Sequence, residues 1–171
     1  MKTRIILPDT EGISEAGAIL RDGGLVAFPT ETVYGLGANA LDTVATKRIY
    51  EAKGRPSDNP MIVHVASIDM LNEVASDVTD EQKAIMSKLW PGPITFVLRK
   101  NPAVPDVTTG GLDTVAVRWP SRREAAEIIE AAGVPIAAPS ANLSGKPSPT
   151  TFEDVAEDMD GRIDAIVKGE R

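Results

Sequence analysis

The chain has 171 residues, of which 42% are hydrophobic and 25% charged, and its formal net charge is −7. These values are typical of a single globular domain, and they argue against a protein built chiefly to coat nucleic-acid phosphates. The absence of cysteine excludes disulfides, thiolate nucleophiles and cysteine-based zinc sites. Because no apolar run is long enough for a signal peptide or a membrane span, we expect a cytoplasmic protein without a membrane partner.

Short β-branched runs alternate with helical stretches along the chain, which predicts an α/β domain. Glycine and proline positions set the expected boundaries in the first part of the chain. In chain order, the expected elements are a helix from Ser14, a strand over 25–28, a loop over 29–40, a helix over 43–52 and a strand over 61–66.

The second part of the chain contains two patterns that are typical of helix starts. Thr79 with Gln82, and Ser121 with Glu124, fit the capping box and predict helices over 80–89 and 122–132. Between them, "PGPITFVLRK" and "TVAVRWP" read as strands joined only by a loop, so we expect a mixed rather than a purely parallel sheet. The remaining expected elements are a strand in "VPIAAPSANLSG", a helix from Thr151 and a strand in "RIDAIV". The total is about six strands and five helices.

Two cations beside a helix-breaking glycine form the first candidate site. In an extended segment Lys53 and Arg55 would point the same way, and together they would hold one phosphate or carboxylate group. The alternative is a solvated helix end, where the macrodipole favours cations in any case. That alternative accounts for Lys53 better than for Arg55, which lies beyond Gly54.

Two further ionisable residues interrupt apolar strands. His64, the only histidine, is expected to be half-buried, and the residues alone favour a core position over a ligand contact. Arg118 is costly in an apolar strand unless its charge is compensated. It is therefore expected either to pair with a carboxylate such as Asp113 or Glu31, or to face a cavity that receives an anionic ligand.

Two polar loops complete the candidate residues. The loop over 29–40 offers hydroxyls and glycine amides, and the loop after the strand in "VPIAAPSANLSG" is rich in serine and asparagine. No Ser-His-Asp set or tight carboxylate pair is evident. This inventory predicts an anion-binding α/β enzyme that positions a phosphorylated substrate and stabilises charge. The residues concerned are Thr30, Thr32, Gly35, Gly37, Ser140, Asn142, Ser144, Lys146 and Ser148.

Five segments of the chain resemble, in the same order, the signature segments of the YrdC/Sua5 family. They are "FPTETVYGLGANA", "KGRPSDNPMIVHV", "LWPGPITFVL", "GLDTVAVRWP" and "VPIAAPSANLSGKPSPT". The resemblance implies one YrdC-like domain over 1–171, with a twisted mixed sheet, flanking helices and a concave ligand cavity. The family's last Ser-Thr strand and the C-terminal Sua5 domain of longer members are expected to be missing from this chain.

The resemblance also implies an activity. The family consists of nucleotidyltransferases that form L-threonylcarbamoyl-AMP and pyrophosphate from L-threonine, bicarbonate and ATP, with Mg²⁺ accompanying the ATP. A downstream threonylcarbamoyl transferase then modifies adenosine 37 of tRNA. Two alternatives remain open: an RNA-binding module without catalysis, and a carbamoyltransferase domain that handles carbamoyl-adenylate.

The family's motifs assign roles to residues of this chain, with no residue assigned to a metal. Lys53 and Arg55 match the K-x-R motif and are the expected catalytic residues, because they would hold the ATP phosphates. The resemblance makes His64 a threonine contact, which reverses the reading from local residues. The expected ATP-binding residues are Lys53, Arg55, Asn59, Thr114, Ala138, Ser140, Asn142 and Ser148, and the expected threonine-binding residues are Thr32, His64 and Arg118.

Overall fold

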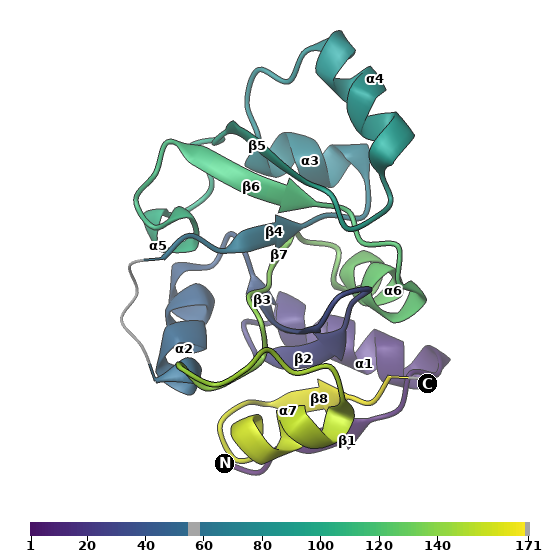
Figure 1. Ribbon diagram of the computed structural model, residues 1–171, viewed down its shortest axis with the longest axis vertical. Helices are drawn as coiled ribbons and strands as arrows, with labels where there is room; N and C mark the ends of the chain where they lie inside the picture. Colours follow the sequence, from purple (N-terminus) through teal and green to yellow (C-terminus); the bar gives the residue numbers. More distant parts are fainter. Residues whose placement is uncertain (55–58, 170–171) are drawn as a thin grey trace.

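The computed structural model describes residues 1–54 and 59–169. Across these residues the chain forms eight strands and seven helices, with all strands in one sheet of order β1-β8-β2-β3-β7-β4-β6-β5 (Figure 1). The strands are β1 (Arg4–Ile6), β2 (Val26–Pro29), β3 (Tyr34–Asn39), β4 (Ile62–His64), β5 (Thr95–Arg99), β6 (Thr114–Arg118), β7 (Ile136–Ala137) and β8 (Ala165–Val167). The helices are α1 (Thr10–Arg21), α2 (Thr43–Lys53), α3 (Ile68–Val74), α4 (Asp80–Leu89), α5 (Asp106–Thr109), α6 (Arg123–Ala132) and α7 (Phe152–Met159).

The sheet is mixed, as the sequence predicts. Strand β8 pairs parallel with both β1 and β2, and β4 pairs parallel with β6. The pairs β2–β3, β3–β7, β7–β4 and β6–β5 are antiparallel. None of the described helices combines the length and apolarity that a membrane crossing needs.

Several expected boundaries were wrong. The segment 29–40 was expected to be a loop, but half of it is strand β3, whose glycines allow it to pack closely against β2 and β7. Helix α1 begins at Thr10 rather than near Ser14, because Asp9 caps it by accepting a hydrogen bond from the Gly12 amide at 2.7 Å. The sequence reading also missed β1, α3 and α5, which are short elements.

The two capping predictions have opposite outcomes. Thr79 and Gln82 form a complete capping box at the start of α4. The predicted box of Ser121 and Glu124 is wrong, because the residue before α6 is Arg122 and no side chain caps it. Ser121 instead donates both its amide (2.5 Å) and its hydroxyl (2.6 Å) to Glu31 Oε2, which fastens the segment after β2 to the start of α6.

The two faces of the β4–β6–β5 region differ in burial. Val63, Val117 and Leu98 point to one face and are buried in the core, whereas Val97 on the other face is 67% exposed. In Figure 1, among the described residues, no helix crosses in front of β4 and β6. The face that carries Arg118 is therefore open towards β5 and partly open at β6, whereas on its β4 side His64 is buried.

Helices α1 and α6 pack closely against each other, and Gly17 lies where they meet. A β-carbon added at Gly17 would lie 2.6 Å from the Ala131 β-carbon and 2.7 Å from the backbone nitrogen of Ala132. Such contacts are far shorter than real carbon atoms tolerate, so the glycine sets how closely the two helices approach.

Gly17→Ala is therefore expected to destabilise the fold by roughly 1–3 kcal/mol, because overpacking outweighs a helix-propensity gain of about 1 kcal/mol. Denaturant unfolding measures the change. Ser14→Ala, on the exposed side of the same helix, is the control and should be neutral or slightly stabilising. A Gly17→Ala protein as stable as the parent would contradict this account of the interface.

Candidate functional site

The end of helix α2 is joined to the serine-rich loop by a buried lysine. Helix α2 ends where Gly54 adopts a left-handed conformation with φ 72°. Lys53, its last residue, is only 2% exposed. Its ammonium group donates to the Ser140 carbonyl and lies 3.5 Å from Asn142 Oδ1. The Lys53 carbonyl also accepts a hydrogen bond from the Ser144 amide at 2.9 Å.

These contacts differ from the extended geometry that was expected for Lys53 and Arg55. Lys53 lies in the last turn of a helix rather than in an extended segment, and it is buried rather than solvated. Arg55, the second member of the expected pair, lies outside the described residues. A buried ammonium requires hydrogen-bond acceptors around it, and the loop oxygens supply them.

Asn142 holds the same loop from within. Its Oδ1 accepts a hydrogen bond from Ser140 Oγ at 2.5 Å, and its Nδ2 donates to the carbonyls of Leu143 (2.8 Å) and Lys146 (2.9 Å). Asp158 on α7 accepts from the Leu143 amide at 3.0 Å and pairs with the Lys146 ammonium at 3.3 Å. The loop is thus fixed from both α2 and α7, and Asp158 is a contributor that the sequence reading missed.

Backbone hydrogen bonds attach the start of this loop to strand β3. The Ala141 amide donates to the Tyr34 carbonyl at 2.9 Å, and the Leu36 amide donates to the Pro139 carbonyl at 2.7 Å. An isolated bridge joins Gly35 and Ser140. The segment after β7 therefore continues beside β3, and it places the loop next to the turn that contains Thr30 and Thr32.

The turn between β2 and β3 is ordered by its own threonines. Thr30 Oγ1 donates to the Val33 carbonyl at 2.5 Å and lies 3.2 Å from Thr32 Oγ1. Thr32 itself is exposed. Its neighbour Glu31 is held by Ser121, and although burial raises the pKa of the Glu31 carboxyl, the hydrogen bonds from Ser121 outweigh this effect and lower the pKa below its ordinary value.

The second group of candidate residues forms a row across neighbouring strands. Strand register places Thr95 opposite Arg118, Arg118 beside His64, and His64 opposite Ile136. The Arg118 guanidinium donates from Nε (3.0 Å) and from Nη2 (2.8 Å) to Thr95 Oγ1. Within the described part of the chain no carboxylate lies within ion-pair distance of Arg118, so the expected pairing with Asp113 or Glu31 is wrong for these residues.

His64 is more deeply buried than expected. It is 2% exposed, and its Nδ1 lies 3.2 Å from the Ile62 carbonyl oxygen. Burial, with a smaller contribution from the neighbouring Arg118 guanidinium, lowers the pKa of His64 from its ordinary 6.5 to about 4. The imidazole is therefore neutral at physiological pH and adds no charge to repel a cation beside it.

The other expected residues are Ala138, Asn59, Thr114 and Ser148. Ala138 is buried, and its amide donates to the Ile62 carbonyl at 3.0 Å, which links the loop side of β7 to β4. Ser140 follows Ile136 by four positions, or about 13 Å of extended chain, so the loop and the row are neighbours on one sheet. Asn59, Thr114 and Ser148 are exposed, and Thr114 begins the same strand that Arg118 ends.

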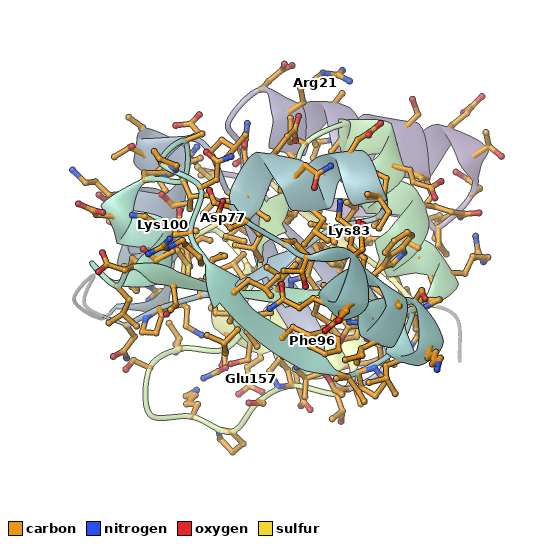
Figure 2. The ribbon with its side chains drawn as sticks, turned by 90° about the horizontal axis from the view of Figure 1, so that it is seen from above. Arg21, Asp77, Lys83, Phe96, Lys100 and Glu157 are labelled. Carbon is orange, nitrogen blue, oxygen red and sulfur yellow. The ribbon has the colours of Figure 1, made fainter. Side chains whose placement is uncertain are left out.

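A cavity elsewhere on the molecule shows a contrasting arrangement. A space of about 670 Å³ lies at the end of β5 that is remote from Thr95, where Lys100 and Asp77 are labelled in Figure 2. Its lysine pairs with Asp106 at 2.7 Å, and Arg99 pairs with Asp77 at 3.3 Å. These cations are neutralised by carboxylates, unlike Arg118. The sequence-predicted residues do not line this cavity.

The mixed sheet, the fixed polar loop and the guanidinium on an open face define an α/β domain suited to anionic ligands. The chain belongs to the Sua5/YciO/YrdC family, whose model, described as "Telomere recombination", matches residues 18–171. It is 58% identical over 90% of its length to the threonylcarbamoyl-AMP synthase of Pyrococcus abyssi, and 56% identical over 92% to that of Bacillus subtilis.

A solved structure extends this similarity to three dimensions. The P. abyssi Sua5 structure in complex with L-threonine matches 100% of this chain and 51% of its own, with a TM-score of 0.93 and 52% identity. The mixed α/β fold that the resemblance implied is confirmed. The chain spans about half the length of these relatives, at 45% of the P. abyssi and 46% of the B. subtilis synthase.

The buried histidine predicts a specific dependence of stability on pH. Because the pKa of His64 is about 4 in the folded protein and 6.5 in the unfolded chain, the unfolded chain binds this proton first as the pH falls. The stability that depends on neutral His64 is thus fully present above pH 6.5 and is lost as the pH falls towards 4.

Between pH 7 and pH 5 the parent should lose roughly 2 kcal/mol more unfolding free energy than His64→Gln, which has no proton to bind there. Denaturant unfolding at the two pH values measures both slopes. The comparison removes the contribution of carboxylates common to both proteins. Equal losses in parent and variant would show that His64 is not held neutral by the fold.

Proposed function

We propose that the chain forms L-threonylcarbamoyl-AMP and pyrophosphate from L-threonine, bicarbonate and ATP. Its similarity to threonylcarbamoyl-AMP synthases over nine-tenths of its length supports this proposal. The structural observation that carries it is the Arg118 guanidinium, which stands on the open face without a carboxylate partner among the described residues. A partly enclosed cation of this kind favours an anionic ligand that completes its hydrogen bonds.

The amino-acid substrate is assigned to the row on β6 and β4. Arg118 would take the carboxylate of L-threonine, because a guanidinium matches a carboxylate in both charge and geometry. His64 lies beside Arg118 as a neutral, buried ring, so its role is to shape the pocket and to provide a ring nitrogen rather than a charge. Thr32 would contribute its exposed hydroxyl from the turn after β2.

The nucleotide is assigned to the fixed loop and its surroundings. Ala138, Ser140 and Asn142 present backbone and side-chain polar groups there, and Ser148 is exposed further along the same segment. The exposed residues Asn59 and Thr114 are assigned to the nucleotide from the family motifs alone. Lys53 would contribute positive charge next to the loop, because its ammonium donates to the Ser140 carbonyl. Contact of Arg55 with the phosphates is proposed from the family motif alone.

The proposed chemistry needs positioning more than a protein nucleophile. The amino group of L-threonine and bicarbonate give a carbamate and water, and a carbamate oxygen attacks the α-phosphorus of ATP while the bond to pyrophosphate breaks. A carbamate oxygen is already anionic, so no residue is assigned as a general base. Burial beside the sheet would protect the carbamate, which decomposes in water.

Magnesium is proposed to enter with the nucleotide. Among the described residues no group of three or more His, Asp or Glu side chains is placed to hold a metal ion, so the phosphates of ATP are its expected ligands. When bound, Mg²⁺ neutralises phosphate charge. The product is proposed to pass to a separate threonylcarbamoyl transferase acting on tRNA, and a cytoplasmic location is proposed with it.

Turnover is tested by incubating the chain with ATP, Mg²⁺, L-threonine and bicarbonate and measuring pyrophosphate. We expect release that depends on all of the substrates and stops when L-threonine is omitted. Release that needs carbamoyl phosphate instead of L-threonine and bicarbonate would support the carbamoyltransferase alternative. Salt-sensitive RNA binding without any pyrophosphate would support the binding-module alternative.

Arg118→Gln is expected to weaken L-threonine binding by roughly tenfold to a hundredfold, because it removes a charged hydrogen-bond partner of the carboxylate. ATP affinity should change much less. Calorimetric titration with each ligand measures both. Arg99→Gln is the matched control, since Arg99 stands on the same face at the other end of β5 and already pairs with Asp77. Equal losses for both ligands would contradict the division of the site.

A further inference from the structure

Thr95 is the only hydrogen-bond partner that the described residues provide for the Arg118 side chain. Its hydroxyl oxygen accepts from Nε at 3.0 Å and from Nη2 at 2.8 Å. The two residues are directly opposite each other in the antiparallel β5–β6 pair. The contact therefore comes from strand register, which fixes the hydroxyl relative to the guanidinium without any flexible loop.

This contact selects one edge of the guanidinium. An arginine offers two forked edges to a carboxylate, one formed by Nε with Nη2 and one formed by Nη1 with Nη2. Thr95 occupies the Nε and Nη2 edge with a single oxygen. The edge left for a ligand is the one at the end of the side chain.

We propose that Thr95 is a positioning residue that orients Arg118, so that the carboxylate of the amino-acid substrate binds end-on to Nη1 and Nη2. For its ligand this inference rests on the proposed function, but the orientation of Arg118 itself does not. Thr95 acts through Arg118 and leaves the nucleotide side unchanged, because β7 and β4 lie between β6 and the loop proposed to bind ATP, and Thr114 lies at the opposite end of β6 from Arg118.

Thr95 contributes little to core packing, so the main effect of its hydroxyl is on the orientation of Arg118. Thr95 lies on an edge strand and its side chain is partly exposed. Phe96, the next residue, points to the opposite face and packs edge-on against Trp90 at 5.0 Å. Valine at position 95 has nearly the same shape and a high strand propensity, so the fold should tolerate it.

Three variants separate these roles. Thr95→Val removes the hydroxyl with little change in shape, Thr95→Ser keeps the hydroxyl, and Val97→Thr exchanges the same residue types two positions along the same face. We expect Thr95→Val to weaken L-threonine binding about fivefold to tenfold, with ATP affinity unchanged, because a misaligned guanidinium loses part of its ligand contact. Thr95→Ser and Val97→Thr should bind L-threonine like the parent.

A second measurement does not depend on any ligand. Proton exchange at Arg118 Nε is read by nitrogen NMR, with the signal assigned by its loss in Arg118→Lys. Exchange should be slow in the parent and in Thr95→Ser, and clearly faster in Thr95→Val, because the acceptor of this proton is gone.

The outcomes are distinguishable. Unchanged Nε exchange in Thr95→Val would overturn the positioning role whether or not L-threonine binds. Equal loss of L-threonine binding in Thr95→Val and Thr95→Ser, or a parallel loss of ATP binding, would also overturn it. If the parent does not bind L-threonine, the proposed function fails, and the exchange rates still decide whether Thr95 orients Arg118.

Discussion

The pairing of the short strand β7 on both of its edges is the constraint on which the rest of the structure depends. Ala137 pairs with Ala38 of β3 on one side and with Val63 of β4 on the other, and both residues of β7 are fully buried. The strand joins the β1-β8-β2-β3 part of the sheet to the β4-β6-β5 part. Because its antiparallel ladders fix the register of both neighbours, they also fix the distance between the polar loop and the Arg118 row.

Charge is distributed in a way that the net value of −7 does not reveal. Several arginines and lysines form ion pairs with carboxylates, as Arg99 does with Asp77 at the surface. Arg118 is different, because its side-chain hydrogen bonds within the described residues go to the uncharged Thr95 hydroxyl. Positive charge solvated by neutral groups attracts an anion more strongly than charge already paired, and the neutral state of His64 avoids further repulsion.

Much of the fold could be predicted from sequence because its signals are local. The capping box at Thr79 and the glycine after α6 act within a few residues, so they appear at the expected places. Strand β3 was missed because its glycines favour a turn when they are considered alone. Its hydrogen bonds to β2 and to the segment after β7 outweigh that preference, and the segment after β7 is distant in sequence.

The sequence by itself determined that the chain is an α/β domain with anion-binding residues, and its motifs identified the family, because residue types and their order carry that information. Only the tertiary structure decided what each side chain touches. Lys53 contacts the Ser140 carbonyl, and Arg118 contacts Thr95, in each case between separate elements of the chain. The neutral state of His64 likewise depends on burial by residues from other elements. Strand register and burial are properties of the assembled sheet, and no local pattern encodes them.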